Sequence, residues 1–166
     1  MIRMITALPA LSLFLVFAAL SVPAVGEVSG GSTEAQVRSV IERFESALAA
    51  RELAKIEPLV APEIVVLENG GRNDGWPDFR DNHLVPEMKE PASPSKSEII
   101  KIAATDEMGW GYSKTLLSLT RPTGEKVEAT LWSAYVVEKR ADGWKIALLD
   151  WSIRVPKPAP LAPPVK

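Results

Sequence analysis

Apolar residues recur at steps of three and four over residues 33–51, and this spacing predicts an amphipathic helix. Ser32 or Thr33 can cap its first turn. The sequence LAKIEPLVA, residues 53–61, predicts a second, shorter helix that ends near Pro62. The residues expected on the buried stripe of the first helix are Val37, Val40, Ile41, Phe44, Ala47 and Leu48.

The next two elements are short. Residues 63–71, EIVVLENGG, form a β-branched run into an Asn-Gly-Gly turn, which predicts a strand. Pro77 suits the first position of a third helix. We expect that helix to end at His83 or Leu84, because Pro86 does not fit comfortably in a helix interior.

Four long β-rich runs follow, separated by the turn sequences DEMG, RPTGEK and RADG. Helices that precede an antiparallel meander predict an α+β domain with its helices on one face of the sheet. We therefore expect N-terminal helices packed in the concave face of a strongly curved antiparallel sheet, a cystatin-like cone that leaves a conical pocket. The four runs cover residues 96–105, 110–121, 126–139 and 144–155.

The N-terminus has the order of a secretory signal. One positive charge, Arg3, precedes an apolar run over residues 5–22, and Ala24 and Gly26 supply small residues before a cut after Gly26. We expect a signal peptide over residues 1–26 and a periplasmic or secreted protein. A retained membrane anchor is the alternative, since the run approaches the length of a span.

The remaining chain reads as a linker over 27–32, one domain over 33–155 and a proline-rich tail over 156–166, which we expect to be disordered. The full chain has 19 Lys and Arg and 21 Asp and Glu, and removing Arg3 changes the net charge from −2 to −3. This balance argues against a nucleic-acid surface. The absence of cysteine excludes disulfides and thiolate chemistry.

Two segments carry a family resemblance. VVEKRADGWKIALLDWSIR, residues 136–154, resembles the end of exported SnoaL-like and calcium/calmodulin-kinase-association-like bacterial proteins. FRDNHLVPEMKE, residues 79–90, resembles the pocket-lining segment of the same group. Over residues 33–155 the chain resembles the nuclear-transport-factor-2-like superfamily, which includes ketosteroid isomerase and the SnoaL-like polyketide cyclases. The resemblance implies the fold, but that fold hosts isomerases, cyclases, dehydratases and proteins without chemistry. Relatives often carry histidine where this chain has Asp150, so a two-histidine arrangement is absent here.

Asp150 and His83 are the candidate acid–base pair. Strand periodicity places Asp150 in an apolar row, the other members of which are Trp144, Ile146, Leu148, Ser152 and Arg154. His83, the only histidine, could lie across the pocket, and such a pair can move protons near neutral pH. The structural alternatives are that Asp150 accepts local hydrogen bonds and that His83 caps the end of its helix.

His83, Glu87 and Asp150 would alternatively form a mixed nitrogen and oxygen ligand set for a metal. Pro86 argues against a simple same-face placement of His83 and Glu87 on a helix. Apolar walls with few polar groups are typical of small-molecule sites. The residues expected to line the pocket are Glu68, Trp76, Phe79, Glu87, Trp110, Trp132, Leu148 and Ser152.

The sequence contains no Gly-x-Ser-x-Gly nucleophile motif, no phosphate loop and no Cys or His pair for zinc, so we expect no cofactor. The first hypothesis is a domain that binds an unidentified small molecule. The alternative is a cofactor-free isomerase or lyase that uses Asp150 and His83. We expect a homodimer, because Leu149, Trp151 and Ile153 would leave an uncovered apolar strip. Neither nucleic-acid binding nor stable membrane insertion after cleavage is expected.

Overall fold

The computed structural model describes residues 31–90, 92–121 and 123–157. The expected signal peptide, residues 1–26, lies outside these residues, as do most of the linker and residues 158–166 of the proline-rich tail. Among the helices in the described part of the chain, none combines the length and apolar character of a membrane span.

The observed elements follow the predicted order. The first helix and the four long strands agree with the expected bounds to within two residues at each end. In chain order the elements are α1 (Thr33–Ala49), α2 (Leu53–Ile56), the 3-10 turn η1 (Glu57–Leu59), β1 (Val60–Glu68), β2 (Gly71–Asp74), α3 (Trp76–Phe79), the π-helical turn η2 (Arg80–Leu84), α4 (Val85–Glu87), β3 (Ser95–Ala104), β4 (Met108–Thr120), β5 (Lys126–Arg140) and β6 (Gly143–Arg154).

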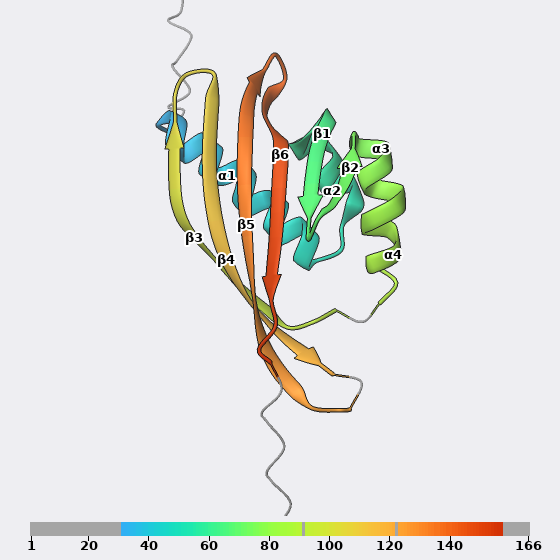
Figure 1. Ribbon diagram of the computed structural model, residues 1–166. Helices are drawn as coiled ribbons and strands as arrows, with labels where there is room; N and C mark the ends of the chain where they lie inside the picture. Colours follow the sequence, from blue (N-terminus) through green and yellow to red (C-terminus); the bar gives the residue numbers. More distant parts are fainter. Residues whose placement is uncertain (1–30, 91, 122, 158–166) are drawn as a thin grey trace, which may run out of the picture.

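The strands form one six-stranded sheet in the order β2-β1-β6-β5-β4-β3. Strands β3 to β6 form the expected antiparallel meander, whereas β1 runs parallel to β6. The sequence did not indicate β2, which returns from β1 through a two-residue turn. Asn69 and Gly70 both have positive φ there, at 47° and 89°, as a type I′ hairpin turn requires. Figure 1 shows the curved sheet with α1 crossing one face and α3 to α4 beside the β1–β2 edge. The α+β cone prediction is confirmed.

Helix α1 lies very close to β4. Ser32 caps the helix by accepting a hydrogen bond from the Ala35 backbone N–H at 3.3 Å. A Cβ atom at Gly109 would lie 2.7 Å from Val37 Cγ2 and 3.0 Å from Val37 Cγ1, both on α1. These approaches are shorter than carbon atoms tolerate, so the sheet admits α1 at this distance only with glycine in place. The fully buried apolar residues of α1 are Val37, Ile41 and Phe44.

Strand β6 contains a β-bulge. Ile146 and Leu148 pair with the consecutive residues Val137 and Val136, which leaves Ala147 as an extra residue. One extra residue moves every later side chain to the opposite face. The predicted row in which Leu148, Asp150 and Ser152 continue the buried face is therefore wrong. The buried residues of β6 are Trp144, Ile146, Leu149 and Trp151.

The sequence predicted that the third helix ends at His83 or Leu84, but the helical segment continues to Glu87, and α4 starts at Val85. The Val85 N–H bonds to the carbonyl oxygen of Arg80, five residues back, which widens the turn η2. Pro86 then falls in the first turn of α4, where a backbone N–H is dispensable and the proline ring is tolerated. The helical path continues, and His83 and Glu87 lie one turn apart on the same side.

Replacing Gly109 with alanine tests the contact between α1 and β4. The added methyl group must displace the Val37 side chain of α1, so we expect Gly109→Ala to lower the free energy of unfolding by about 1–3 kcal/mol. Urea unfolding measures the change. Ser118→Ala, at an exposed position of the same strand, is the control and should change the stability by less than about 0.5 kcal/mol. Equal unfolding midpoints for both variants would contradict the packing described above.

Candidate functional site

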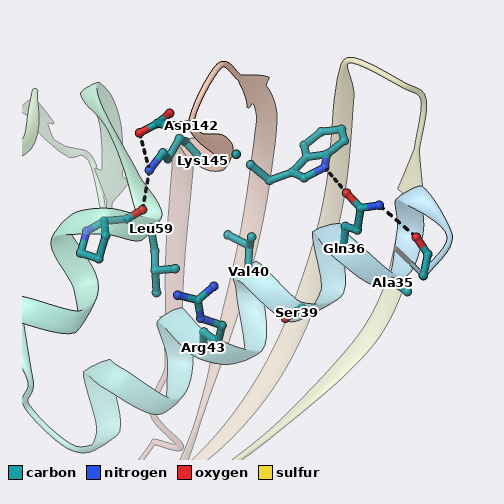
Figure 2. A pocket seen from close by; sticks show the side chains of 12 residues that line it. Ala35, Gln36, Ser39, Val40, Arg43, Leu59, Asp142 and Lys145 are labelled. Carbon is teal, nitrogen blue, oxygen red and sulfur yellow. Dashed lines mark hydrogen bonds and ion pairs between the residues drawn. The ribbon is translucent and has the colours of Figure 1, made fainter. Parts of the chain in front are cut away.

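A surface hollow of about 710 Å³ lies at the N-terminal end of α1. Several of its polar groups pair with groups around it, as Figure 2 shows for Gln36 and Lys145. Gln36 accepts a hydrogen bond from Trp144 Nε1 at 3.1 Å, and Lys145 Nζ lies 2.6 Å from the Pro58 carbonyl oxygen and 3.0 Å from Asp142. These contacts join α1, η1 and the turn between β5 and β6, and they pair Gln36, Asp142 and Lys145 without a ligand.

A second cavity lies at the C-terminal end of α1, against the inner face of the sheet. It has two adjoining lobes, with volumes of about 400 and 290 Å³. The first, which we call the hydroxyl lobe, includes Glu45 and Tyr135. The second, which we call the β1 lobe, includes Glu68 and Glu87. The apolar residues that line both lobes are Leu48, Leu117, Leu131 and Trp151.

Three hydroxyl groups converge on the Glu45 carboxylate in the hydroxyl lobe. Ser113 Oγ donates to Oε1 at 2.5 Å, Tyr135 OH donates to Oε1 at 2.8 Å, and Ser97 Oγ donates to Oε2 at 2.8 Å. Burial raises the pKa of Tyr135, and the charge of Glu45 raises it further, so the phenol stays protonated and remains a donor. The protein's own hydroxyl groups therefore supply the hydrogen bonds that this carboxylate needs.

Sequence reasoning missed Glu45. The available signal was a carboxylate directly after the buried Phe44, at the edge of the apolar stripe of α1. Ser113 and Ser133 gave a second signal, because both are polar residues on the inward face of long strands and both are buried. A buried polar side chain requires a partner. Which partner serves Ser113 depends on how α1 crosses the sheet, and local pattern does not contain that information.

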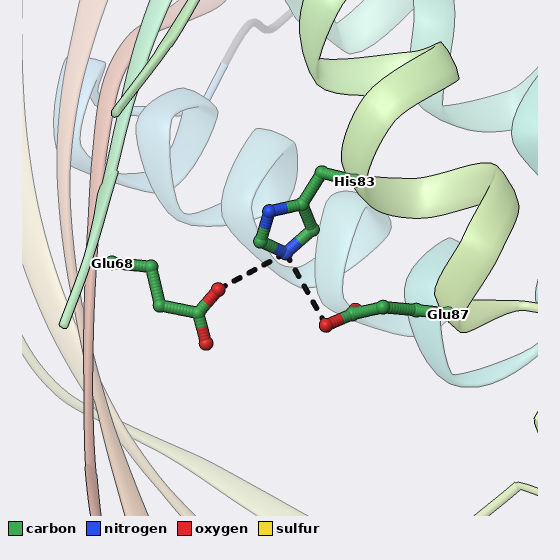
Figure 3. Close-up of side chains that lie close together, drawn as sticks. All are labelled: Glu68, His83 and Glu87. Carbon is green, nitrogen blue, oxygen red and sulfur yellow. Dashed lines mark ion pairs between the residues drawn. The ribbon is translucent and has the colours of Figure 1, made fainter. Parts of the chain in front are cut away.

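Glu68, His83 and Glu87 meet at the β1 lobe. His83 Nε2 lies 3.1 Å from Glu68 Oε2 and 3.4 Å from Glu87 Oε1, and Figure 3 shows it facing the space between the two carboxylates. The imidazole side chain is only 14% exposed. The rings of Phe79 and Trp151 lie 5.4 and 5.5 Å from the imidazole ring, centroid to centroid. These aromatic neighbours fix the imidazole in place.

For both His83 and Glu68, burial and the attraction of an oppositely charged neighbour shift the pKa in opposite directions. Pairing with the Glu87 carboxylate raises the pKa of His83, although burial opposes that shift. Burial raises the pKa of Glu68, the charge of His83 opposes this shift, and the charge of Glu87 adds to it. Nε2 is inaccessible to solvent, and neither carboxylate oxygen accepts a well-directed hydrogen bond from it at 3.1 and 3.4 Å. The three side chains are thus close together without a satisfied hydrogen-bond arrangement.

The structure separates Asp150 from His83. Asp150 lies opposite Ala134 of β5 on the outer face of the sheet, whereas its neighbours Leu149 and Trp151 face the core. The predicted placement of Asp150 in a pocket with His83 is wrong, and so is the metal set of His83, Glu87 and Asp150. The cause is the bulge at Ala147. Glu68, at the end of β1, occupies the position beside His83 that was expected for Asp150.

The other expected pocket residues fall into three groups. Glu68 and Glu87 line the β1 lobe. Trp76 and Phe79 are buried in the core. The remaining residues are on the outer face of the sheet: Trp110, Trp132, Leu148 and Ser152. The bulge in β6 explains this for Leu148 and Ser152, which follow it in that strand. The prediction of an uncovered apolar strip at Leu149, Trp151 and Ile153 is also wrong. The bulge turns Leu149 and Trp151 inward, where they are buried within their own chain.

Comparisons with solved structures define the fold class. Neither a protein-family model nor a curated protein matches the sequence. A ketosteroid isomerase-like protein from Erwinia carotovora atroseptica superimposes with a TM-score of 0.66 at 14% identity, covering 78% of this chain and all of the other. An NTF2-like superfamily protein from Salmonella enterica gives 0.61 at 16%, covering 80% and 96%. An NTF2-like protein of unknown function from Pseudomonas putida gives 0.59 at 16%, covering 72% and 84%. The chain is an α+β cone, and its fold is that of the nuclear-transport-factor-2-like superfamily.

The titration of His83 tests the geometry of the cluster. In chelator-treated protein we expect the His83 ring to titrate above its ordinary pKa of about 6.5, because the Glu87 carboxylate stabilises the imidazolium. Glu87→Gln should lower that pKa, whereas Asp150→Asn, on the other face of the sheet, should leave it unchanged. NMR of the single histidine measures all three values. A shift in Asp150→Asn without one in Glu87→Gln would refute this arrangement.

Proposed function

We propose that this protein binds a small organic molecule in the two-lobed cavity. The observation that carries the proposal is that the two neighbouring lobes share an apolar wall of Leu48, Leu117, Leu131 and Trp151, with a carboxylate group beyond each end of this wall. The lobe volumes of about 400 and 290 Å³ are in the range of natural ligand pockets. Apolar walls supply affinity, and a few fixed polar groups supply orientation.

The wall chemistry favours a ligand with an apolar body and hydrogen-bond donors at its ends. Glu45 and Glu68 offer carboxylate oxygens, which accept hydrogen bonds when ionised. Arg51 also lines the β1 lobe, and its Nη1 donates to the Glu87 carbonyl oxygen at 3.2 Å. The fold similarity to a ketosteroid isomerase-like protein is compatible with such a ligand.

Proton transfer within this cavity is the second candidate function. The observation that favours it is the half-buried Glu68 carboxylate beside His83 Nε2, since burial raises the pKa of Glu68 toward the range of a general base. An isomerase or lyase would then use Glu68 in the place first expected for Asp150. This function requires His83 to be free to carry a proton.

Filling the cavity tests the binding proposal. We expect native mass spectrometry of protein purified from its own compartment to show a retained small molecule, and Leu117→Trp to abolish it because Leu117 lines both lobes. Ser118→Trp is the matched control, since that nearby side chain points to the other face of β4 and is exposed. Equal retention by both variants would contradict the proposal, as would wild-type protein with no bound molecule. The same spectra give the mature mass and so test the proposed export with loss of residues 1–26.

We also propose that the outer face of the sheet pairs with a second copy of the chain. Trp110, Leu116 and Trp132 are 45%, 40% and 44% exposed on neighbouring strands of that face, and the Tyr112 ring lies 6.3 Å from the Trp132 ring. A twofold axis brings the same patch of both copies together and covers these side chains with one contact. This assigns the expected homodimer to the face opposite Trp151.

Charge insertion on this face tests the dimer. We expect sedimentation equilibrium at tens of micromolar to give a dimer for wild type and a monomer for Trp132→Lys, because the lysine ammonium would have to be desolvated in the contact. Val155→Lys is the control: Val155 is equally exposed, at 44%, but lies after the end of β6. A monomeric wild type, or a dimeric Trp132→Lys variant, would refute the proposed interface.

A further inference from the structure

We propose that Glu68, His83 and Glu87 form a binding site for one divalent transition-metal ion such as Zn²⁺. The three residues come from separate elements, the end of β1, the π turn η2 and the end of α4. One oxygen or nitrogen atom of each lies within 4.8 Å of the others. The proposal does not depend on the small-molecule function, since it concerns the ligand set alone.

The separations between these atoms are those of metal ligands. Zn–N and Zn–O bonds of about 2.0–2.2 Å place two ligand atoms about 3.0 Å apart at a right angle and about 3.4 Å apart at a tetrahedral angle. The observed separations from His83 Nε2 are 3.1 Å to Glu68 and 3.4 Å to Glu87. All three ligand atoms lie within 4.8 Å of one another, so an ion between them requires the glutamate side chains to close around it.

The direction of His83 Nε2 is the second, independent observation. This nitrogen is inaccessible to solvent and has no hydrogen-bond partner, although two carboxylate oxygens are within reach of it. An imidazolium paired with one carboxylate would direct its N–H at an oxygen. Nε2 instead faces the gap between the two oxygens, as Figure 3 shows, and an ion in that gap would satisfy all three groups.

The charge of the site also fits a divalent cation. Among the described residues, neither Glu68 nor Glu87 forms an ion pair with lysine or arginine, and their only ionic contact is His83. Two carboxylates and a neutral imidazole carry two negative charges, which balance a 2+ ion, and binding would release any proton held on the ring. One imidazole nitrogen with two carboxylate oxygens suits zinc and its neighbours better than Mg²⁺ or Ca²⁺, which prefer oxygen alone.

The surrounding structure holds the ligands in place. Phe79 and Trp151 pack against the imidazole, and β1 places Glu68 beside Trp151 through the parallel pairing with β6. Arg51 fixes the backbone of α4 through the Glu87 carbonyl oxygen. Both glutamates also line the β1 lobe, so the open coordination positions of a three-ligand site would face the cavity.

Titration of chelator-treated protein with Zn²⁺ tests the site. The full chain, expressed without an affinity tag, should bind one Zn²⁺ by calorimetry, and the NMR signals of the His83 ring should move on binding. These signals are unambiguous because the chain has one histidine and no cysteine. Glu68→Gln and Glu87→Gln should each weaken binding by more than about tenfold. Mg²⁺ should leave the ring signals unchanged.

Asp150→Asn is the matched control, since it removes a carboxylate from the other face of the sheet and should bind Zn²⁺ as wild type does. Glu87 is 61% exposed, so Glu87→Gln keeps the test valid even if Glu68→Gln fails to fold. The proposal is overturned if wild type binds no Zn²⁺, if His83 signals stay fixed, or if both glutamine variants bind normally. A loss in Asp150→Asn alone would equally overturn it.

Discussion

The extra residue at Ala147 determines which side chains this protein presents to its cavity and which it presents to solvent. Before Ala147, Trp144 and Ile146 face the core, and after it Leu149 and Trp151 do so. Without the bulge, the strand would send Trp151 outward and place Asp150 against the helices. The cavity wall at Trp151 and the surroundings of His83 both depend on this single shift of register.

The bulge affects the site through Trp151, which it turns inward against His83. Its ring lines both lobes of the cavity and packs against Phe79 and His83, at 5.8 and 5.5 Å between centroids. The parallel pairing of β1 with β6 places Glu68 next to Trp151, so the carboxylate and the imidazole meet beside the same indole. Helix α1 contributes the other boundary. It lies close to the sheet over Gly109 and Gly111, and it ends at Ala49, beside the cavity.

Most of the fold could be predicted from the sequence, because its helix and strands each have a periodicity that is visible in a short segment. The period of α1, the four long strands and their turns are each properties of a short window, and all were recovered. The site was predicted less well for identifiable reasons. The bulge at Ala147 has no signal in a run of apolar residues, since Ala147, Leu148 and Leu149 suit either face. Pro86 suggested a helix end, and only the π turn before it explains why the helix continues. Glu68 and Glu45 gained their partners through tertiary packing, which strand and helix periods do not specify.

The two ends of the cavity solve the same physical problem differently. A partly buried carboxylate is costly unless it is hydrogen-bonded or paired. At the hydroxyl lobe the protein provides the whole solution, because Ser97, Ser113 and Tyr135 donate to Glu45. At the β1 lobe the protein does not provide it, because His83 Nε2 makes no well-directed hydrogen bond to Glu68 or Glu87. One proton on His83 offsets only one of those two negative charges, whereas a divalent cation offsets both and also occupies the unpaired nitrogen. The hydroxyl lobe is thus complete as it stands, and the β1 lobe is the end of the cavity at which an added charge has the most to stabilise.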